Sequence, residues 1–452
     1  MIANANSIRI PLANKSVHMC VTSPPYYGLR DYGLTGTEWD TVTYTPMAGL
    51  PSVTVQPWRG CLGLEPTPEM FVAHIVAVFR EVWRVLRDDG TCWINFGDSY
   101  ATGTKADRQA STGLLAHHTA QDISRIGTPS GLKTKDLIGI PWRLAFALQA
   151  DGWYLRNDII WHKPNPMPES VTDRCTKSHE YLFLLAKSAR YFYDNEAVKE
   201  QNITQPGPLR NRAEEQYNDS FPGGHFSGGE RTFYSETGRN RRTVWTISTT
   251  PYKGAHFATY PPDLVAPCIL AGTSQRGVCP ICGAQWERVI EKKGKSTYEK
   301  MKQDHGVTHE EMHEFAKAEG RNLKGGQEAW GQTRDENGNV PSLGSRESST
   351  LGWRPTCDCN AERFDMEYYT AAEIAELEVD IAPVPAKVFD PFVGSGTTGQ
   401  VARETGRKFI GLDLSIKYLR ENALVRSEQK QTQESLEQLP MFTPQTAAAN
   451  RQ

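Results

Sequence analysis

The chain has 452 residues, of which 38% are hydrophobic and 23% charged, proportions that are ordinary for a globular protein. It has no run of about 18 apolar residues, its start lacks a secretory signal pattern, and its nine cysteines are mostly scattered. These features argue against a membrane-spanning protein and a secreted disulfide scaffold, and the prediction is a cytoplasmic protein. The net charge of −3 argues against a broadly basic surface but is compatible with a local basic cleft.

The first predicted elements, in chain order, form a strand–helix–strand unit. Residues 16–21 alternate and are β-branched, which predicts a strand. Residues 70–90 carry apolar side chains at helical spacing and end at Gly90, a typical helix terminus. Residues 91–100 predict a second strand and a loop. Two strands joined by a helix indicate a parallel sheet and an α/β fold.

The middle of the chain predicts a loop, a helix and two strands. Residues 101–135 are rich in Thr, Ser, Gly and His, which predicts a mobile loop. Residues 137–153 predict a helix that stops at Gly152. Residues 154–163 and 180–188 are candidates for buried strands.

Two insertions and a tail interrupt this pattern. In residues 201–242 Gly, Pro, Asn, Arg and Glu dominate and the apolar periodicity vanishes. Residues 277–379 are expected to form a second insertion, which carries two cysteine pairs. The stretch after residue 428 is rich in Gln, Ser and Thr and predicts a flexible tail.

The stretch GSGTTG, residues 394–399, follows a predicted strand and precedes a predicted helix. Asp413 lies 19 positions beyond Gly394, at the end of the next strand, which is the layout of a Rossmann-type nucleotide site. A bare strand-to-helix turn is the alternative. An NAD site shares the pattern, but Asp390, before the turn, would repel a pyrophosphate. Asp390 suits a cofactor with a cationic amino group, such as S-adenosylmethionine.

The stretch TSPPY, residues 22–26, follows the first strand and therefore lies at the ligand-binding edge of a parallel sheet. Pro24 and Pro25 restrict the backbone and hold Ser23 and Tyr26 in a set geometry. The Ser23 hydroxyl and the Pro24 carbonyl could accept both hydrogens of an amino group, and Tyr26 could stack on a flat ring. This predicts a pocket for the exocyclic amine of a base. The alternative is a surface turn in which Tyr26 and Tyr27 are core rings.

TSPPY followed later by DPFVGSGTT, residues 390–398, resembles the paired motifs of the β group of DNA amino-methyltransferases. In that family the catalytic motif precedes a target-recognition region and then the S-adenosylmethionine motif. Residues 256–269 resemble the family helix that leads to the cofactor motif. WINFGDSY and DIIWHKPNPMPES resemble other family blocks, so the resemblance covers most of the chain outside the insertions. Asn6 is a departure, because many relatives carry aspartate there.

The resemblance implies a Rossmann-like methyltransferase fold with a mostly parallel sheet flanked by helices. It divides the chain into a catalytic half (1–200), a target-recognition region (201–245), a linking helix (246–276), the cysteine-bearing insertion (277–379), a cofactor-binding half (380–428) and a tail (429–452). The implied catalytic residues are Ser23, Pro24, Pro25 and Tyr26. The implied cofactor-binding residues are Asp390, Pro391, Phe392, Gly394, Gly396, Thr397, Thr398, Asp413, His256 and Thr259.

The resemblance also implies that the target base leaves the duplex and that its amine attacks the sulfonium methyl directly. A carbon-5 cytosine enzyme would need a Pro-Cys nucleophile in such a loop. Cys268 follows Pro267, but within a predicted helix. In this family serine in the first motif position tends to go with cytosine N4 and aspartate with adenine N6, so cytosine is favoured and adenine is the alternative.

The two cysteine pairs lie toward the ends of the second insertion. C-x-x-C followed by glycine is typical of a zinc knuckle, and a C-x-C pair would complete a tetrahedral site for structural Zn²⁺. The alternatives are a reduced surface pair or a redox C-x-x-C. The four predicted ligands are Cys279, Cys282, Cys357 and Cys359.

Four basic residues are candidates for contacts with double-stranded DNA. Arg239, Arg241 and Arg242 form a cluster where target recognition belongs, and Lys163 follows a strand near the cleft. Each could equally be a solvated loop residue. A cognate restriction endonuclease is a further expected partner.

Three other functions compete with this interpretation. One is methylation of RNA or of a small molecule, and another is an NAD-dependent oxidoreductase. The third is a zinc-bearing DNA-binding module with an inactive core, against which the intact SPPY and DPFVGSG motifs argue.

Overall fold

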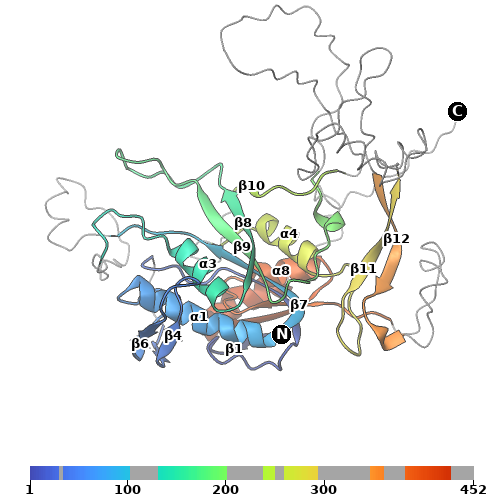
Figure 1. Cartoon of the computed structure of the whole chain (residues 1–452), viewed down its shortest axis with the longest axis horizontal. Helices are drawn as coiled ribbons and strands as arrows, with labels where there is room; N and C mark the ends of the chain where they lie inside the picture. The colour runs from blue at the N-terminus through green and yellow to red at the C-terminus, as the bar shows by residue number, and fades with distance from the viewer. Residues whose placement is uncertain are drawn as a thin grey trace, which may run out of the picture.

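A computed structural model describes residues 1–29, 34–101, 131–200, 238–249, 259–293, 347–360 and 382–428. Eight strands form one sheet in the order β1-β14-β13-β2-β7-β9-β8-β10 (Figure 1). β9 runs antiparallel to both neighbours, and the other pairings in this sheet are parallel, as predicted. The strands are β1 (Ile2–Asn4), β2 (Val17–Thr22), β7 (Leu86–Phe96), β8 (Tyr154–His162), β9 (His179–Ala186), β10 (Val244–Thr246), β13 (Lys387–Asp390) and β14 (Lys408–Asp413).

Helices cover both faces of the sheet and enclose two cores. α1 (Pro68–Val85) and α3 (Ile140–Ala150) pack on one face, and α4 (Pro262–Gly272) and α8 (Thr397–Glu404) pack on the other. Successive residues of β2 point to opposite faces, so Cys20 joins the first core while Met19 and Val21 join the second. The predicted α/β architecture is therefore confirmed.

The predicted strand–helix–strand unit is present, but the helix ends earlier than expected. Thr67 caps α1 by accepting a hydrogen bond from the Met70 N–H, and the chain becomes extended at Leu86, the first residue of β7. Gly90 therefore lies within the strand, and its assignment as a helix terminus was wrong. A Cβ at Gly90 would lie 2.8 Å from the His18 carbonyl oxygen, so close approach of two strands explains the glycine.

The other predicted elements are confirmed with small shifts of their ends. The helix predicted at 137–153 is α3, followed by Gly152 at a φ of +109°. The two candidate strands are β8 and β9, and the strand–turn–helix–strand near the chain end is β13, α8 and β14. Because parallel strands share a direction, β2, β7, β13 and β14 end at one edge of the sheet, here called the carboxyl edge.

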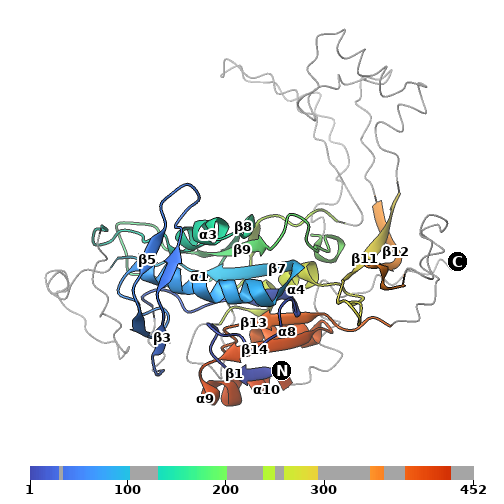
Figure 2. The same cartoon turned by 60° about the horizontal axis from the view of Figure 1, so that its bottom comes forward.

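Several short elements were not predicted. Two two-stranded sheets lie between β2 and α1, and a hairpin belongs to the second insertion and stands apart from the main sheet (Figure 2). These strands are β3 (Thr37–Trp39), β4 (Val42–Tyr44), β5 (Val53–Val55), β6 (Trp58–Gly60), β11 (Trp286–Lys293) and β12 (Glu347–Pro355). The short helical segments are η1 (Glu196–Val198), η2 (Asp358–Asn360), α9 (Ile416–Tyr418), η3 (Leu419–Ala423) and α10 (Leu424–Glu428).

Some predictions fall outside the described residues. These are most of the mobile loop, most of the target-recognition region, much of the second insertion, the tail after residue 428 and the candidate His256. Among the helices that the structure does describe, none combines the length and apolarity needed to cross a bilayer.

Candidate active site

Asp390 ends β13 and lies fully buried between the two predicted motifs. One carboxylate oxygen accepts hydrogen bonds from Thr22 Oγ1 (2.6 Å) and the Phe392 N–H (3.0 Å). The other accepts from Thr398 Oγ1 (2.6 Å) and the Tyr260 hydroxyl (3.2 Å). Burial raises the pKa of Asp390, and these donors oppose that rise. Because Thr22 precedes Ser23, Asp390 ties the Pro-Pro loop (residues 22–27) to the glycine-rich turn (residues 394–399).

The glycine-rich turn closes around the Asp413 carboxylate. Gly394 adopts a φ of +48° and donates its N–H to Asp413 Oδ2 (3.1 Å), while Ser415 donates its N–H to Oδ1 (2.9 Å). Gly396 adopts a φ of +84°, and a Cβ there would lie 2.8 Å from the Ala423 Cα. Gly394 is therefore favoured by its positive φ, and Gly396 by its positive φ and by the close approach of Ala423.

A cavity of about 510 Å³ lies between the two loops. Its wall combines residues from both motifs and from the start of α4, among them Ser23, Pro25, Thr259, Phe392, Gly394 and Asp413. Pro391 and Thr397 also line it. Asp390, Gly396 and Thr398 are buried and support this wall from behind.

Part of the cavity wall was not found from the sequence. Trp39 and Thr37 line it from β3, and Asn6 lines it from the loop after β1. The Asn6 amide donates to Thr37 Oγ1 (3.3 Å), so the residue in the position of the family aspartate still faces the cavity. The wall strands between β2 and α1 are only three residues long, too short for a period-2 signal.

Tyr26 is held by a ring contact and by polar side chains at the end of β7 and the start of β9. Its ring stacks on Phe96 with centroids 5.4 Å apart. Its hydroxyl lies 2.7 Å from Glu180 Oε2 and 3.0 Å from Asn95 Oδ1, and it can donate its single hydrogen to one of them at a time. The Ser23 hydroxyl lies 3.4 Å from Asn95 Oδ1 and 3.4 Å from the Tyr26 hydroxyl. The structure thus brings Ser23 and Tyr26 together.

The neighbouring Tyr27 plays a different part. It is 2% exposed and packs on Phe71 with ring centroids 5.4 Å apart. Burial raises the pKa of its hydroxyl. The core-ring alternative therefore holds for Tyr27, whereas Tyr26 is half-buried beside Ser23.

Lys163 lies beside this pocket. Its ammonium pairs with Glu180, the carboxylate that also reaches Tyr26, and lies 4.3 Å from the centroid of the Trp161 ring. Lys163 is only 18% exposed, so its charge is largely neutralised within the protein. Sequence reasoning missed Glu180 and Asn95. Their only signal was a polar residue at the end of an otherwise apolar strand.

The predicted arginine cluster lies before the amino end of β10, and the chain runs from it toward the carboxyl edge. Arg239 and Arg242 both pair with Glu200, at 3.1 and 2.9 Å. The Arg241 guanidinium stacks over Trp245, 4.4 Å from the ring centroid, and desolvation by burial lowers its pKa. All three guanidinium groups therefore have partners within the protein.

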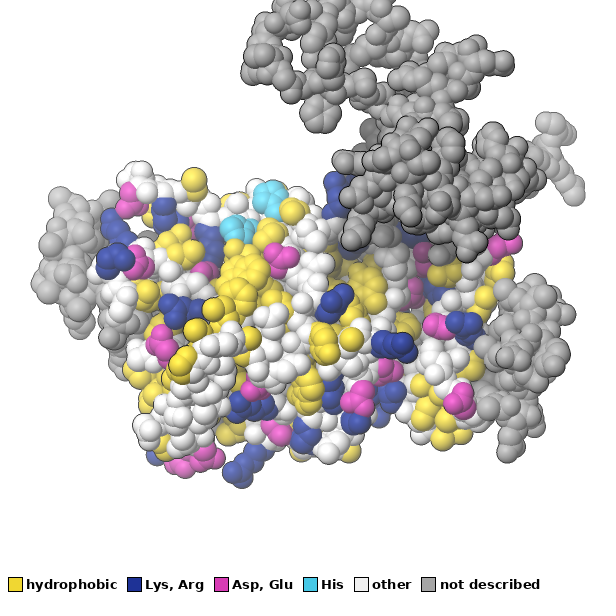
Figure 3. Space-filling model, in the orientation of Figure 1, with side chains coloured by type: hydrophobic (Ala, Val, Ile, Leu, Met, Phe, Trp, Pro, Cys, Tyr) yellow, Lys and Arg dark blue, Asp and Glu magenta, His cyan; other side chains and the backbone are white. Residues whose placement is uncertain are grey.

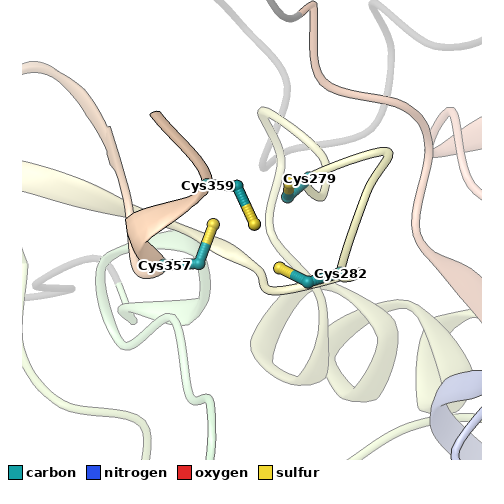
Figure 4. A group of neighbouring side chains, drawn as sticks. All are labelled: Cys279, Cys282, Cys357 and Cys359. Carbon is teal, nitrogen blue, oxygen red and sulfur yellow. The ribbon is translucent and has the colours of Figure 1, made fainter. Parts of the chain in front are cut away.

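The two cysteine pairs meet at the base of the β11–β12 hairpin (Figure 4). Pairing of Trp286 with Pro355 brings the turn before β11 beside the turn after β12. The Sγ atoms of Cys279, Cys282, Cys357 and Cys359 all lie within 4.8 Å of one another. The predicted grouping of the four cysteines is therefore present.

Residues 17–279 and 385–424 match the model of the N6_N4_Mtase family, described as DNA methylase. The chain therefore belongs to the family of DNA amino-methyltransferases that modify base N4 or N6 atoms. The resemblance inferred from the two motifs is confirmed at the level of the family. The match passes over residues 280–384, which hold the β11–β12 hairpin.

Relatives of known name are Type II methyltransferases. M.Cfr9I of Citrobacter freundii is 45% identical over 270 residues, which cover 60% of this chain and 71% of that protein. M.SmaI of Serratia marcescens is 42% identical over 257 residues, covering 57% and 69%. M.SfiI of Streptomyces fimbriatus is 29% identical over 426 residues, covering 90% and 86%. A solved PvuII DNA methyltransferase, titled cytosine-N4-specific, aligns with a TM-score of 0.44 and 12% identity over 96% of this chain and 88% of that one.

Proposed function

We propose that this DNA methyltransferase transfers a methyl group from S-adenosylmethionine to the N4 amine of a cytosine flipped out of double-stranded DNA. One observation carries the proposal. The Asp390 carboxylate hydrogen-bonds both Thr22, next to Ser23, and the N–H of Phe392, in the wall of the cavity. The amine pocket and the cofactor cavity are thereby fixed relative to each other, as direct transfer between two bound reactants requires.

The cavity residues fit the methyl donor. In this proposal Asp413 holds the ribose hydroxyls, and the turn at Gly394 leaves room for close approach. S-adenosylmethionine supplies an electrophilic methyl group on a sulfonium. Asp390 has four protein donors of its own, so its role is to order both loops rather than to contact the ligand.

The Pro-Pro loop supplies the acceptors for the target amine. Ser23 Oγ and the Pro24 carbonyl accept its two hydrogens, which leaves the nitrogen lone pair free for in-line attack. As the N–C bond forms, the methyl C–S bond breaks and S-adenosylhomocysteine leaves, and the methylated nitrogen then loses one of its protons to water. Tyr26 stacks on the flipped base and returns about 1–3 kcal/mol of the free energy spent on unstacking. Cytosine is favoured over adenine because the motif begins with serine, and N6-adenine methylation by the same groups is the second candidate.

Modified-base analysis of DNA from cells that express the protein tests this proposal. We expect N4-methylcytosine from the wild type, and its loss in Ser23→Ala and Tyr26→Ala proteins that still bind S-adenosylmethionine. N6-methyladenine would overturn the choice of base and keep the mechanism. Sequencing the modified DNA would give the recognition site. The Type II names of the relatives suggest a restriction endonuclease as a partner, and digestion of unmodified DNA with an endonuclease encoded nearby would show whether it cuts the same sequence.

We further propose that the four cysteines bind a structural Zn²⁺. Zn–S bonds of about 2.3 Å in a tetrahedron place sulfurs about 3.8 Å apart, which the observed grouping within 4.8 Å can reach by small rotations. Four thiolates would leave no open position, so the ion would be structural. The Cys282 carbonyl accepts from Arg87 (2.7 Å) and the Gly283 carbonyl contacts His18 (3.0 Å), which joins the knuckle to β7 and β2.

A further inference from the structure

The loop that joins β8 to β9, residues 163–178, begins beside the proposed base pocket. Its first residue, Lys163, pairs with Glu180, which also reaches the Tyr26 hydroxyl. Asn165 then fixes the loop to the segment after β10, because its side chain accepts from the Thr249 N–H (3.0 Å) and donates to the Thr249 carbonyl (3.3 Å). Figure 1 shows the loop projecting beyond the ends of β8 and β9.

The second half of the loop, residues 169–178, is also held by hydrogen bonds. Glu169 accepts hydrogen bonds from Arg174 Nη1 (2.7 Å) and from the Lys177 N–H (3.3 Å). Lys177 Nζ donates to the Asp98 carbonyl (2.8 Å), just past the end of β7. The three residues between the anchors Asn165 and Glu169 therefore form a supported tip.

Met167 stands at the centre of this tip and is 85% exposed. Pro166 precedes it and Pro168 follows it, so its backbone is restricted on both sides. Single exposed apolar side chains are common on protein surfaces, but this one is presented by a backbone that two prolines and the flanking hydrogen bonds of Asn165 and Glu169 restrict. Met167 lies four positions after Lys163, so their Cα atoms lie within roughly 14 Å of each other.

We propose that Met167 inserts into the DNA duplex and fills the gap left by the flipped base. Apolar side chains, methionine among them, act as wedges between base steps in other DNA-binding proteins. Methionine is unbranched and adapts to irregular gaps, and the proline-flanked backbone loses little conformational entropy on insertion. The loop would thus couple base removal to occupation of the pocket at Tyr26. This inference rests on the base flipping of the proposed function.

The test uses the full-length protein and duplexes that contain the recognition site found by sequencing. Single-turnover methylation is measured for wild type, Met167→Ala, Met167→Leu and Ile281→Ala. Ile281 is a matched control, since it is 67% exposed and lies in the knuckle loop that contacts the amino ends of β2 and β7. Each protein is assayed on a paired target and on a duplex with the target base mismatched. A 2-aminopurine beside the target reports flipping by the wild type.

We expect Met167→Ala to be about tenfold slower than wild type on the paired duplex, as loss of a buried methionine side chain would give. The defect should shrink on the mismatched duplex, where flipping requires less free energy. Met167→Leu and Ile281→Ala should methylate like the wild type. If Met167→Ala is slowed equally on both duplexes, or is not slowed at all, while the wild type still flips the base, the role of Met167 as a wedge is wrong. No flipping by the wild type would overturn the proposed flipping as well.

Discussion

Single residues outside the two motifs hold the motifs in place. Tyr260 donates to one oxygen of Asp390, and Asn95 and Glu180 surround the Tyr26 hydroxyl. These partners come from the segment before α4 and from the ends of β7 and β9. The motif residues therefore reach their observed positions only when several segments that are distant in the sequence pack together.

Replacing Tyr26 by Phe tests the hydroxyl while keeping the ring. We expect the single-turnover methylation rate to fall about tenfold, because a hydrogen bond to a charged group contributes about 1.5–3 kcal/mol. Glu180→Gln should produce a fall of the same order. The double variant should lose less than the sum of the two single losses, because both substitutions remove the Tyr26–Glu180 contact, while Glu180→Gln also weakens the pairing with Lys163. Fully additive losses would show that Glu180 acts independently of Tyr26.

Replacing Asp390 by Asn tests the link between the loops. An amide brings its own donors to a site already filled with donors, so we expect the free energy of unfolding to fall by about 2–3 kcal/mol. Affinity for S-adenosylmethionine should fall with it. Asp413→Asn, at a partly exposed residue of the cavity wall, should lower the affinity with a smaller loss of stability. Urea unfolding and titration calorimetry would measure both, and equal stability losses would contradict this division of roles.

At the scale of elements, the strands and helices that were predicted from longer sequence patterns are present in the structure. β2, α1, β8 and β9 carry clear apolar patterns, whereas α8 was predicted from the glycine-rich turn that precedes it. The end of α1 was misplaced because Gly90 was read as a local stop signal. Its actual reason is a neighbour in space, the β2 backbone at His18, which no local pattern reports.

Gly90→Ala tests this account of β7. The new methyl group would lie 2.8 Å from the His18 carbonyl oxygen and 2.7 Å from Leu86 Cδ1. We expect a loss of about 1–3 kcal/mol in the free energy of unfolding, as overpacked sites show. A second substitution, Leu86→Val, should recover only part of this, since the carbonyl contact remains. A stability equal to wild type, measured by urea unfolding, would contradict close packing at this point.

At the scale of the whole molecule, the second insertion contacts the catalytic domain at several points. Arg288 of β11 pairs with the buried Asp194 (2.8 Å), and the cysteine knuckle contacts His18 and Arg87. The knuckle therefore sits against the amino ends of β2, which leads into the Pro-Pro loop, and of β7. Its stability should be linked to that of the sheet.

Removal of the proposed zinc measures that link. We expect about one Zn²⁺ per chain by elemental analysis, and a lower thermal midpoint after chelation. Cys282→Ser should reproduce the effect of chelation, whereas Cys175→Ser, at an exposed cysteine outside the cluster, should leave both quantities unchanged. If the purified protein contains no zinc and its thermal midpoint does not change after chelation, the proposed zinc site is wrong.

On the face that Figure 3 shows, the described Lys and Arg side chains do not gather into one large patch. In the view of Figure 3, Lys and Arg side chains are interspersed with Asp and Glu. Because Glu200 already pairs with Arg239 and Arg242, we expect their double replacement by Ala to leave the salt dependence of DNA binding unchanged. Lys135 is 79% exposed but pairs with Asp173 (2.8 Å), so Lys135→Ala should leave the slope unchanged as well. A reduced slope in the arginine variant would instead support the DNA contacts predicted from the sequence.

The sequence by itself determined the family, the order of the motifs, the parallel sheet and the cysteines that would group. These features depend on local patterns: residue type, short spacing and apolar period. Only the tertiary structure decided that Asp390 faces Thr22, that Tyr26 and Tyr27 have different roles, and that Arg239 and Arg242 pair with Glu200. Each of these depends on which distant segments meet across the sheet, and the physical cause is packing and hydrogen-bond satisfaction in three dimensions.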